Sequence, residues 1–337
     1  MMTAGAPIAS SRARWLYGLA VFLLLLGQWR PLALLAAIPE PWILVLSEAA
    51  SGRWGFGTEV VFTHGPFSDL YTRLFNPATY RTVLVVSYAS LAFQTIAFTL
   101  LAARSRGRLF PLLLLPALFF LVPRDIQLLV TPLLVVLLTL GSRDERWLLP
   151  LTVAGALLAA MGTLAKFSLF PTSLGLFLLA DIDRLRRRRI PVALATYAIV
   201  LAAAFPLLAS PGSAFVTFLA TSWMTSAGHG AAQAITGPWL DVVVYALLFA
   251  AAAAAVIGAE WRRAKAERRF GWDAAAPLLA LLFFLWITIK MGFGRHDLHV
   301  LTTISGLAVG LCVFGMARLP PALLRRWQVA ALAAVVP

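Results

Sequence analysis

The stretch WLLPLTVAGALLAAMGTLA, residues 147–165, decides the fold class of this chain. It contains no charged side chain and lies between Arg146 and Lys166. An apolar helix of about 20 residues crosses the hydrocarbon core of a bilayer. Comparable runs recur along the 337 residues, of which 61% are hydrophobic and 12% are charged. A soluble domain could not bury so much apolar surface, so we predict an all-α, polytopic membrane bundle.

The apolar runs predict about 10–11 membrane spans. They lie near residues 15–37, 82–103, 109–122, 126–140, 147–165, 168–180, 190–208, 240–258, 275–290 and 299–316, with a partial run from 327. Several are shorter than a perpendicular span, so the hairpins 109–140 and 147–180 either cross the membrane or re-enter it. We expect one transmembrane domain, 1–337, whose last run stops at Pro337 and leaves open a truncated chain.

Arginine clusters occupy every second connection between these runs. The clusters lie around residues 12–14, 104–108, 143–146, 184–189, 262–269 and 318–326. Short loops rich in arginine and lysine stay in the cytoplasm, so we expect the N-terminus inside and the chain in a bacterial inner membrane. The net charge of +14 then reflects membrane insertion, and we exclude nucleic acid as a partner.

The opposite, periplasmic loops are longer and carry the other polar residues. The first spans 39–81, and within it 41–50 suits a short interfacial helix with Trp42 in the headgroup layer. The second spans 209–239. Loops of this length in a compact membrane protein are usually functional. All four histidines and two of the lysines fall on this side: His64, His229, His296, His299, Lys166 and Lys290.

Three acidic residues and one histidine of the first loop are candidates for chemistry. Glu48 ends the apolar helix, and a carboxylate close to a low dielectric suits a general base. A solvated charge at a helix end is the alternative interpretation. His64 and Asp69 flank a Gly-Pro turn, so they could line one pocket together with Glu59. The alternative here is a loop that packs aromatic side chains on the membrane.

Lys166 stands between two apolar runs, far in sequence from any other charge. A lone lysine near membrane depth costs about 2.5–3.5 kcal/mol unless it snorkels or pairs. It therefore either snorkels to the interface or binds a phosphate. Backbone N–H groups at the start of the next helix, 168–172, would add to such an anion site.

The connection 290–299 is unusually dense in ionisable side chains: Lys290, Arg295, His296, Asp297 and His299. Its two cations favour a pocket for phosphate or pyrophosphate. The His-Asp-x-His pattern leaves a divalent metal as an alternative, and simple capping of the neighbouring helices is a third. His229 lies in the stretch 226–233, which we expect to be either a mobile loop over the site or merely solvated.

Three short motifs resemble the C-superfold glycosyltransferases, which use polyprenyl-phosphate-linked sugars. Ser47-Glu48 stands where these enzymes carry an acidic motif, although one acidic residue stands here where two are common. Gly65-Pro66-Phe67 resembles their Gly-Pro segment, and Gly162-Thr163-Leu164-Ala165-Lys166 resembles a Gly-x-x-x-Lys segment near the end of a middle span. The similarity covers mainly residues 1–180. Residues 62–66 and 290–299 also resemble patterns in bacterial membrane proteins of this type.

The resemblance implies transfer of a sugar to a glycan, lipid or protein acceptor at the periplasmic face. Glu48 or Asp69 would take the proton of the acceptor. Lys166, Lys290 and Arg295, with His296, would stabilise the departing lipid phosphate. A divalent metal remains an option as cofactor. The alternatives are a transporter or flippase for an anionic lipid-linked glycan and a non-catalytic membrane component of polysaccharide assembly. A proton-coupled transporter is less favoured, since the apolar runs carry few ionisable residues at depth.

Overall fold

The protein is all-α in its computed structural model, which describes residues 11–29, 40–52, 54–105, 107–119, 122–140, 142, 145–209, 212–232, 236–268, 271–294 and 299–318. The helices are α1 (Ser11–Trp29), α2 (Pro41–Ala50), α3 (Asp69–Thr72), α4 (Tyr80–Arg104), α5 (Leu109–Phe119), α6 (Arg124–Thr139), α7 (Glu145–Ala165), the 3₁₀ helix η1 (Phe167–Leu169), α8 (Phe170–Arg186), α9 (Ala193–Leu208), α10 (Phe215–Ala232), α11 (Trp239–Glu267), α12 (Trp272–Phe293) and α13 (Val300–Arg318). Within the described residues, extended pairing is confined to two isolated β-bridges. The predicted fold class is confirmed.

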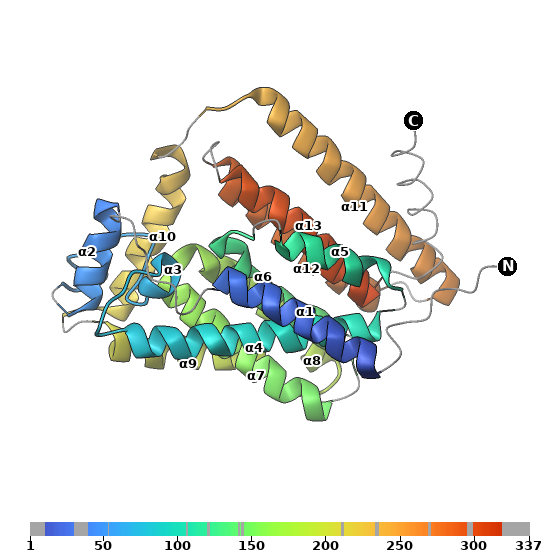
Figure 1. Ribbon diagram of the computed structural model, residues 1–337, viewed down its shortest axis with the longest axis horizontal. Helices are drawn as coiled ribbons and strands as arrows, with labels where there is room; N and C mark the ends of the chain where they lie inside the picture. The colour runs from blue at the N-terminus through green and yellow to red at the C-terminus, as the bar shows by residue number, and fades with distance from the viewer. Residues whose placement is uncertain are drawn as a thin grey trace.

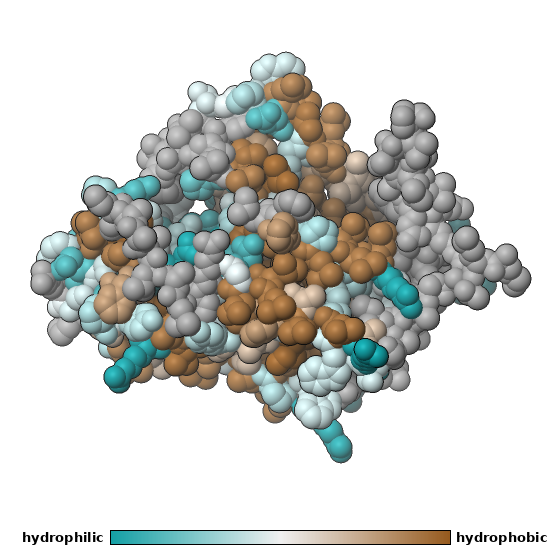
Figure 2. Space-filling model, in the orientation of Figure 1, coloured by the Kyte–Doolittle hydropathy of each residue, from teal (hydrophilic) through white to brown (hydrophobic). Residues whose placement is uncertain are grey.

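Five of the described helices are long and apolar enough to cross a membrane: α4, α7, α11, α12 and α13. Large apolar side chains on these helices are exposed, among them Val85, Leu247 and Trp286. Figure 2 shows apolar side chains over much of one face of the molecule. An exposed apolar surface of this extent indicates contact with lipid, so the chain is a multi-pass membrane protein.

Helix α6 is the centre of the bundle, although its apolar run looked short for a span. Every residue from Asp125 to Leu138 is buried, and the helix packs against α4, α7, α8, α12 and α13. Its 16 residues reach about 24 Å at the usual rise per residue. Because protein surrounds it on all sides, α6 needs no long lipid-facing surface. The packing of α6 between these helices holds its first turn, which contains Arg124 and Asp125, in place.

The predicted second loop, 209–239, contains a helix, α10, over much of its length. The residues 226–233, predicted to be flexible, fall largely within this helix, and so does the backbone of His229. The serine, threonine and glycine residues of the segment weaken its apolar pattern. Tertiary contacts favour the helix: Phe218 of α10 packs against Phe167 and Phe205, with ring centroids 6.1 and 5.2 Å away. The short helix predicted over 41–50 in the first loop is confirmed as α2.

The two ends of the bundle differ in charge. One end, here the arginine end, carries ion pairs that tie α8, α11, α12 and α13 together. Arg187 pairs with Asp183 and Asp273 at 3.0 Å each, and Arg318 pairs with Glu260 at 3.3 Å. The opposite end, here the α2 end, comprises α2, α3, α10 and the first turns of α4 and α6 (Figure 1). Arg187 and Arg318 therefore join neighbouring helices at this end.

Candidate functional site

The first loop and the α7–η1 connection are joined by backbone hydrogen bonds at the α2 end. Phe167 N donates to Thr63 O at 2.8 Å, Gly65 N to Ala165 O at 3.4 Å, and Phe67 N to Leu164 O at 3.1 Å. The pairing forms an antiparallel β-bridge between His64 and Lys166. Residues paired in this way project to the same side. Two segments about 100 residues apart in sequence thus bring a histidine and a lysine side by side.

Gly65 is required for this close approach. A Cβ atom at this position would lie 2.5 Å from Leu164 O and 2.8 Å from Cζ of Phe218. The carbonyl belongs to the opposite strand of the pairing, so it cannot move away without breaking the pairing. Phe218 of α10 closes the other side. The glycine of the Gly-Pro segment is therefore needed because any larger residue at position 65 would collide with Leu164 O and Phe218.

Lys166, Tyr71 and Asp125 form a closed ring of hydrogen bonds beside the bridge. Lys166 Nζ donates to Asp125 Oδ1 at 2.7 Å and to Tyr71 OH at 3.0 Å. Tyr71 OH donates in turn to Asp125 Oδ2 at 3.1 Å. The ammonium also lies 4.3 Å from the centre of the Tyr71 ring, which adds a cation–π contact. The side chains of Lys166 and Asp125 are 14% and 6% exposed, so solvent screens this ion pair weakly.

The charge states of this cluster follow from its contacts. Burial acts to lower the pKa of Lys166, but the attraction of Asp125 and Tyr71 outweighs it and raises the pKa above its usual value. Burial, together with the charge of Asp125, raises the pKa of the Tyr71 phenol. Lys166 is therefore a cation and Tyr71 a hydrogen-bond donor at neutral pH. Such a lysine suits anion binding and does not suit nucleophilic catalysis.

Aromatic rings pack around His64, the other member of the bridge. The ring of His64 lies 5.2 Å from Trp42, 5.4 Å from Phe62 and 5.0 Å from Tyr71, measured between centroids. Its Nδ1 is 3.3 Å from Thr63 Oγ1. Trp42 belongs to α2, so these contacts attach the interfacial helix to the cluster. His64 is buried by this packing.

Arg124 anchors α3 to the first turn of α6. Its Nε and one terminal nitrogen donate to Leu70 O at 3.2 and 2.8 Å, and the other terminal nitrogen donates to Gln127 Oε1 at 2.9 Å. The guanidinium also lies 4.3 Å from the centre of the Trp29 ring. These partners are neutral, so Arg124 contributes a positive charge next to Asp125. The arrangement holds α3 in place without help from the Lys166–Asp125 pair.

Asp69, a predicted alternative base, lies inside the scaffold of the first loop. It is 1% exposed. Its Oδ2 accepts hydrogen bonds from Asn76 Nδ2 at 3.0 Å and from Thr79 Oγ1 at 2.6 Å. Burial raises the pKa of Asp69, and these hydrogen bonds act against that rise. The carboxylate links α3 to the start of α4, and it makes no recorded contact with Lys166, Tyr71 or Asp125.

The two predicted glutamates lie apart from the ring of hydrogen bonds. Glu48 is half-buried in the last turn of α2. Helical spacing places it roughly 120° around the axis from Trp42, the residue of α2 that contacts His64. Glu59 is exposed, and its Oε2 accepts a hydrogen bond from Gly55 N at 2.6 Å within a local turn.

Two of the residues predicted in the second half of the chain, Lys290 and His299, are described and lie outside this cluster. Lys290 is exposed in the last turn of α12, and His299 O accepts a hydrogen bond from Thr302 N at 2.9 Å at the start of α13. The contacts given above for Lys166, Tyr71 and Asp125 involve neither Lys290 nor His299. Three of the predicted residues lie outside the described residues: Arg295, His296 and Asp297. Among the described residues, no group of three or more His, Cys, Asp or Glu side chains is placed to hold a metal ion.

Asp125 and Tyr71 are the members that sequence reasoning missed. Asp125 had a signal: it is a lone acid directly before a long apolar run, as Lys166 is a lone base directly after one. Isolated opposite charges at the same membrane depth gain much from pairing. Tyr71 had no comparable signal, because a tyrosine in a loop is common.

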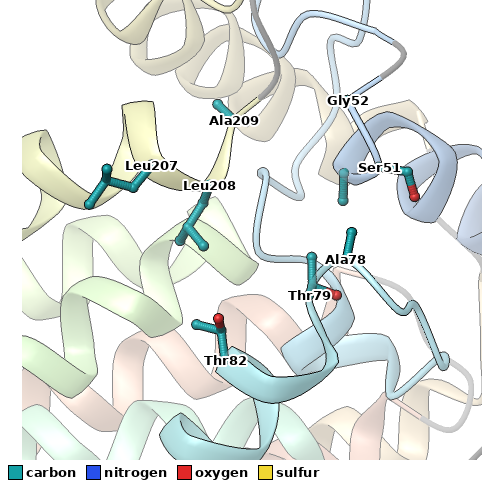
Figure 3. Close-up of a pocket in the computed structure, with 9 residues that line it drawn as sticks. Ser51, Gly52, Ala78, Thr79, Thr82, Leu207, Leu208 and Ala209 are labelled. Carbon is teal, nitrogen blue, oxygen red and sulfur yellow. The ribbon is translucent and has the colours of Figure 1, made fainter.

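A shallow pocket lies on another side of the first-loop scaffold (Figure 3). Its volume is about 280 Å³, and small or apolar residues line it: Ala50, Ser51, Gly52, Ala78, Thr79, Thr82, Leu207, Leu208 and Ala209. No charged side chain lines it. Thr79 connects the pocket wall to Asp69. An anionic group is therefore better served by Lys166 than by this pocket.

Comparison with known proteins does not assign the chain to a family. No family model, no curated protein and no solved structure matches the chain. The functional argument therefore rests on the cluster of Lys166, Tyr71, Asp125 and His64.

Proposed function

We propose that this protein is a membrane glycosyltransferase that moves a sugar from a polyprenyl-phosphate donor to a glycan, lipid or protein acceptor. The reaction would take place at the α2 end, facing the periplasm of a bacterium. One observation carries the proposal. Gly65-Pro66-Phe67 and the segment ending in Lys166, two of the three motifs behind the resemblance, pair through backbone hydrogen bonds beside the partly buried ammonium group of Lys166.

The chemistry of the cluster supports stabilisation of a leaving phosphate. An acceptor hydroxyl would attack the anomeric carbon, the bond from that carbon to the phosphate oxygen would break, and the electron pair would stay on the phosphate. Donors already oriented in a water-poor site stabilise such developing charge strongly. Lys166 and Tyr71 supply a cation and a hydroxyl donor at one point. The proton of the acceptor would go to a carboxylate, for which we propose Glu48; Asp69 is fixed inside the first-loop scaffold by hydrogen bonds from Asn76 and Thr79.

A transporter of the same lipid receives less support from the described helices. An ion-coupled carrier needs ionisable residues along its path through the membrane. From Leu128 to Thr139 the central helix α6 has no ionisable side chain. The ion pairs of the described residues gather at the arginine end and at the Lys166 cluster instead. Binding at one face fits an enzyme better than passage through the bundle.

The test is a transfer assay with purified protein in liposomes. The donors are radiolabelled polyprenyl-phosphate hexose and polyprenyl-phosphate pentose, and the acceptors are glycan, lipid and protein fractions of a bacterial envelope. We expect label in one acceptor fraction and release of free polyprenyl phosphate. Empty liposomes give the background. Movement of intact donor across the bilayer without transfer to any acceptor would contradict the proposal and favour the transporter.

A further inference from the structure

We propose that Asp125 is an internal competitor for the phosphate site: its carboxylate engages Lys166 and Tyr71, and the phosphate group of a ligand takes over both contacts and displaces it. This inference rests on the proposed function and adds to it how the site exchanges its anion. It assigns Tyr71 as a second phosphate donor and Asp125 as the group that must leave.

The geometry of the pair supports an exchange. Asp125 uses one carboxylate oxygen for each donor, 2.7 Å from Lys166 Nζ and 3.1 Å from Tyr71 OH. Two oxygens of a phosphate can accept from the same two donors, since phosphate and carboxylate both bind bidentately. The donors also contact one another at 3.0 Å, so they remain a preformed pair when the acceptor changes. While the acceptor changes, the cation–π contact with the Tyr71 ring keeps the Lys166 ammonium in place.

The fold does not depend on the Lys166–Asp125 pair to hold its segments together. The first loop is fixed to the α7–η1 connection by three backbone hydrogen bonds. Helix α3 is fixed to α6 by the two hydrogen bonds from Arg124 to Leu70 O. A buried ion pair is in general weak support for stability, because desolvation offsets much of its attraction. The segments around the site therefore stay joined by other contacts when the pair exchanges.

Charge decides which ligand can displace Asp125. A sugar-linked phosphodiester carries one negative charge, as the carboxylate does, so Lys166 and Tyr71 donate to an acceptor of the same charge after the exchange. As the bond to the sugar breaks, the phosphate gains a second charge, which strengthens its attraction to the Lys166 ammonium. Binding is then stronger late in the reaction than at its start, which is what accelerates a chemical step. A neutral ligand cannot replace the carboxylate in this way.

The experiment measures binding of undecaprenyl phosphate to the full chain in nanodiscs. We expect Asp125→Asn to bind this lipid at least fivefold more tightly than the wild type, because the competitor loses its charge. Tyr71→Phe should bind it several-fold more weakly. Asp183→Asn is the matched control: Asp183 and Asp125 are both 4% exposed, and Asp183 pairs with Arg187 at the arginine end. It should leave binding unchanged.

A second measurement uses the wild-type protein, so it does not depend on the fold of a variant. Carbodiimide labels accessible carboxylates, and the labelling of Asp125 is followed by mass spectrometry. Undecaprenyl phosphate should increase that labelling several-fold, and inorganic phosphate at equal concentration should not if the ligand is a lipid headgroup. An equal increase with inorganic phosphate would assign the site to free phosphate.

The outcomes separate this inference from the proposed function. Lipid binding that depends on Lys166, but with no tighter binding in Asp125→Asn and no added labelling of Asp125, overturns the inference and leaves the proposed function standing. Absence of any Lys166-dependent binding of the lipid by the wild type overturns both.

Discussion

Replacing Lys166 with glutamine is expected to lower kcat/KM for sugar transfer at least 100-fold. Removal of one preorganised donor to a developing oxyanion typically costs about 10²–10³ in rate. Lys166 is the cation of the ring that it forms with Tyr71 and Asp125, and its ammonium stays charged at neutral pH. Lys166→Arg keeps the charge but changes the donor geometry, so it should retain part of the activity. Initial rates with the labelled polyprenyl-phosphate donor measure the effect.

A double variant separates the loss of chemistry from a loss of structure. Lys166→Gln alone leaves the Asp125 carboxylate buried without its cation, which destabilises a protein. In Asp125→Asn/Lys166→Gln a neutral amide pair replaces the ion pair and can still hydrogen-bond. This variant should regain thermal stability and remain inactive. Activity within a few-fold of the wild type in the double variant would remove Lys166 from the mechanism.

Replacing Gly65 with alanine is expected to lower the free energy of unfolding by about 1–3 kcal/mol, the range typical of overpacking. The added methyl group would lie 2.5 Å from Leu164 O. The bridge between His64 and Lys166 must then open, which shifts Lys166 relative to Tyr71 and Asp125. Displacement of about 1 Å at a site can cost about 10² in rate. We therefore expect lower thermal stability and at least tenfold slower transfer in the same variant.

Gly27→Ala is the matched control for that substitution. Gly27 lies in α1, and a Cβ atom there would meet nothing within 4 Å. Alanine is the better helix former by about 1 kcal/mol, so this variant should be as stable as the wild type or slightly more so. If Gly65→Ala behaved like Gly27→Ala in both stability and transfer, the pairing of the two segments would not position the site.

The sequence was sufficient for the helical membrane fold because apolar runs of spanning length need no tertiary information. It was insufficient for α10, whose apolar pattern is weak and whose helix is supported by contacts of Phe218 with distant rings. The sequence did not show the central position of α6 either, because the burial of residues 125–138 depends on the helices packed around them.

The candidate site was half predictable. Lys166 and His64 stood out as isolated polar residues, but their pairing across about 100 residues depends on the fold. Asp69 looked like an available acid because its partners Asn76 and Thr79, close in sequence, cannot be recognised as partners without the turn that brings them together. Asp125 was overlooked because its importance comes from Lys166, which lies on another hairpin.

The central claim is that a lipid phosphate binds at the α2 end, on Lys166. Photocrosslinking tests it most directly, with a polyprenyl phosphate that carries a diazirine beside the phosphate and with mass-spectrometric mapping of the labelled peptides. We predict crosslinks in peptides covering 62–71 and 162–170, suppressed by excess undecaprenyl phosphate and lost in Asp125→Asn/Lys166→Gln. Crosslinks at the arginine end, or crosslinks scattered along the lipid-facing helices and unchanged in that variant, would contradict it.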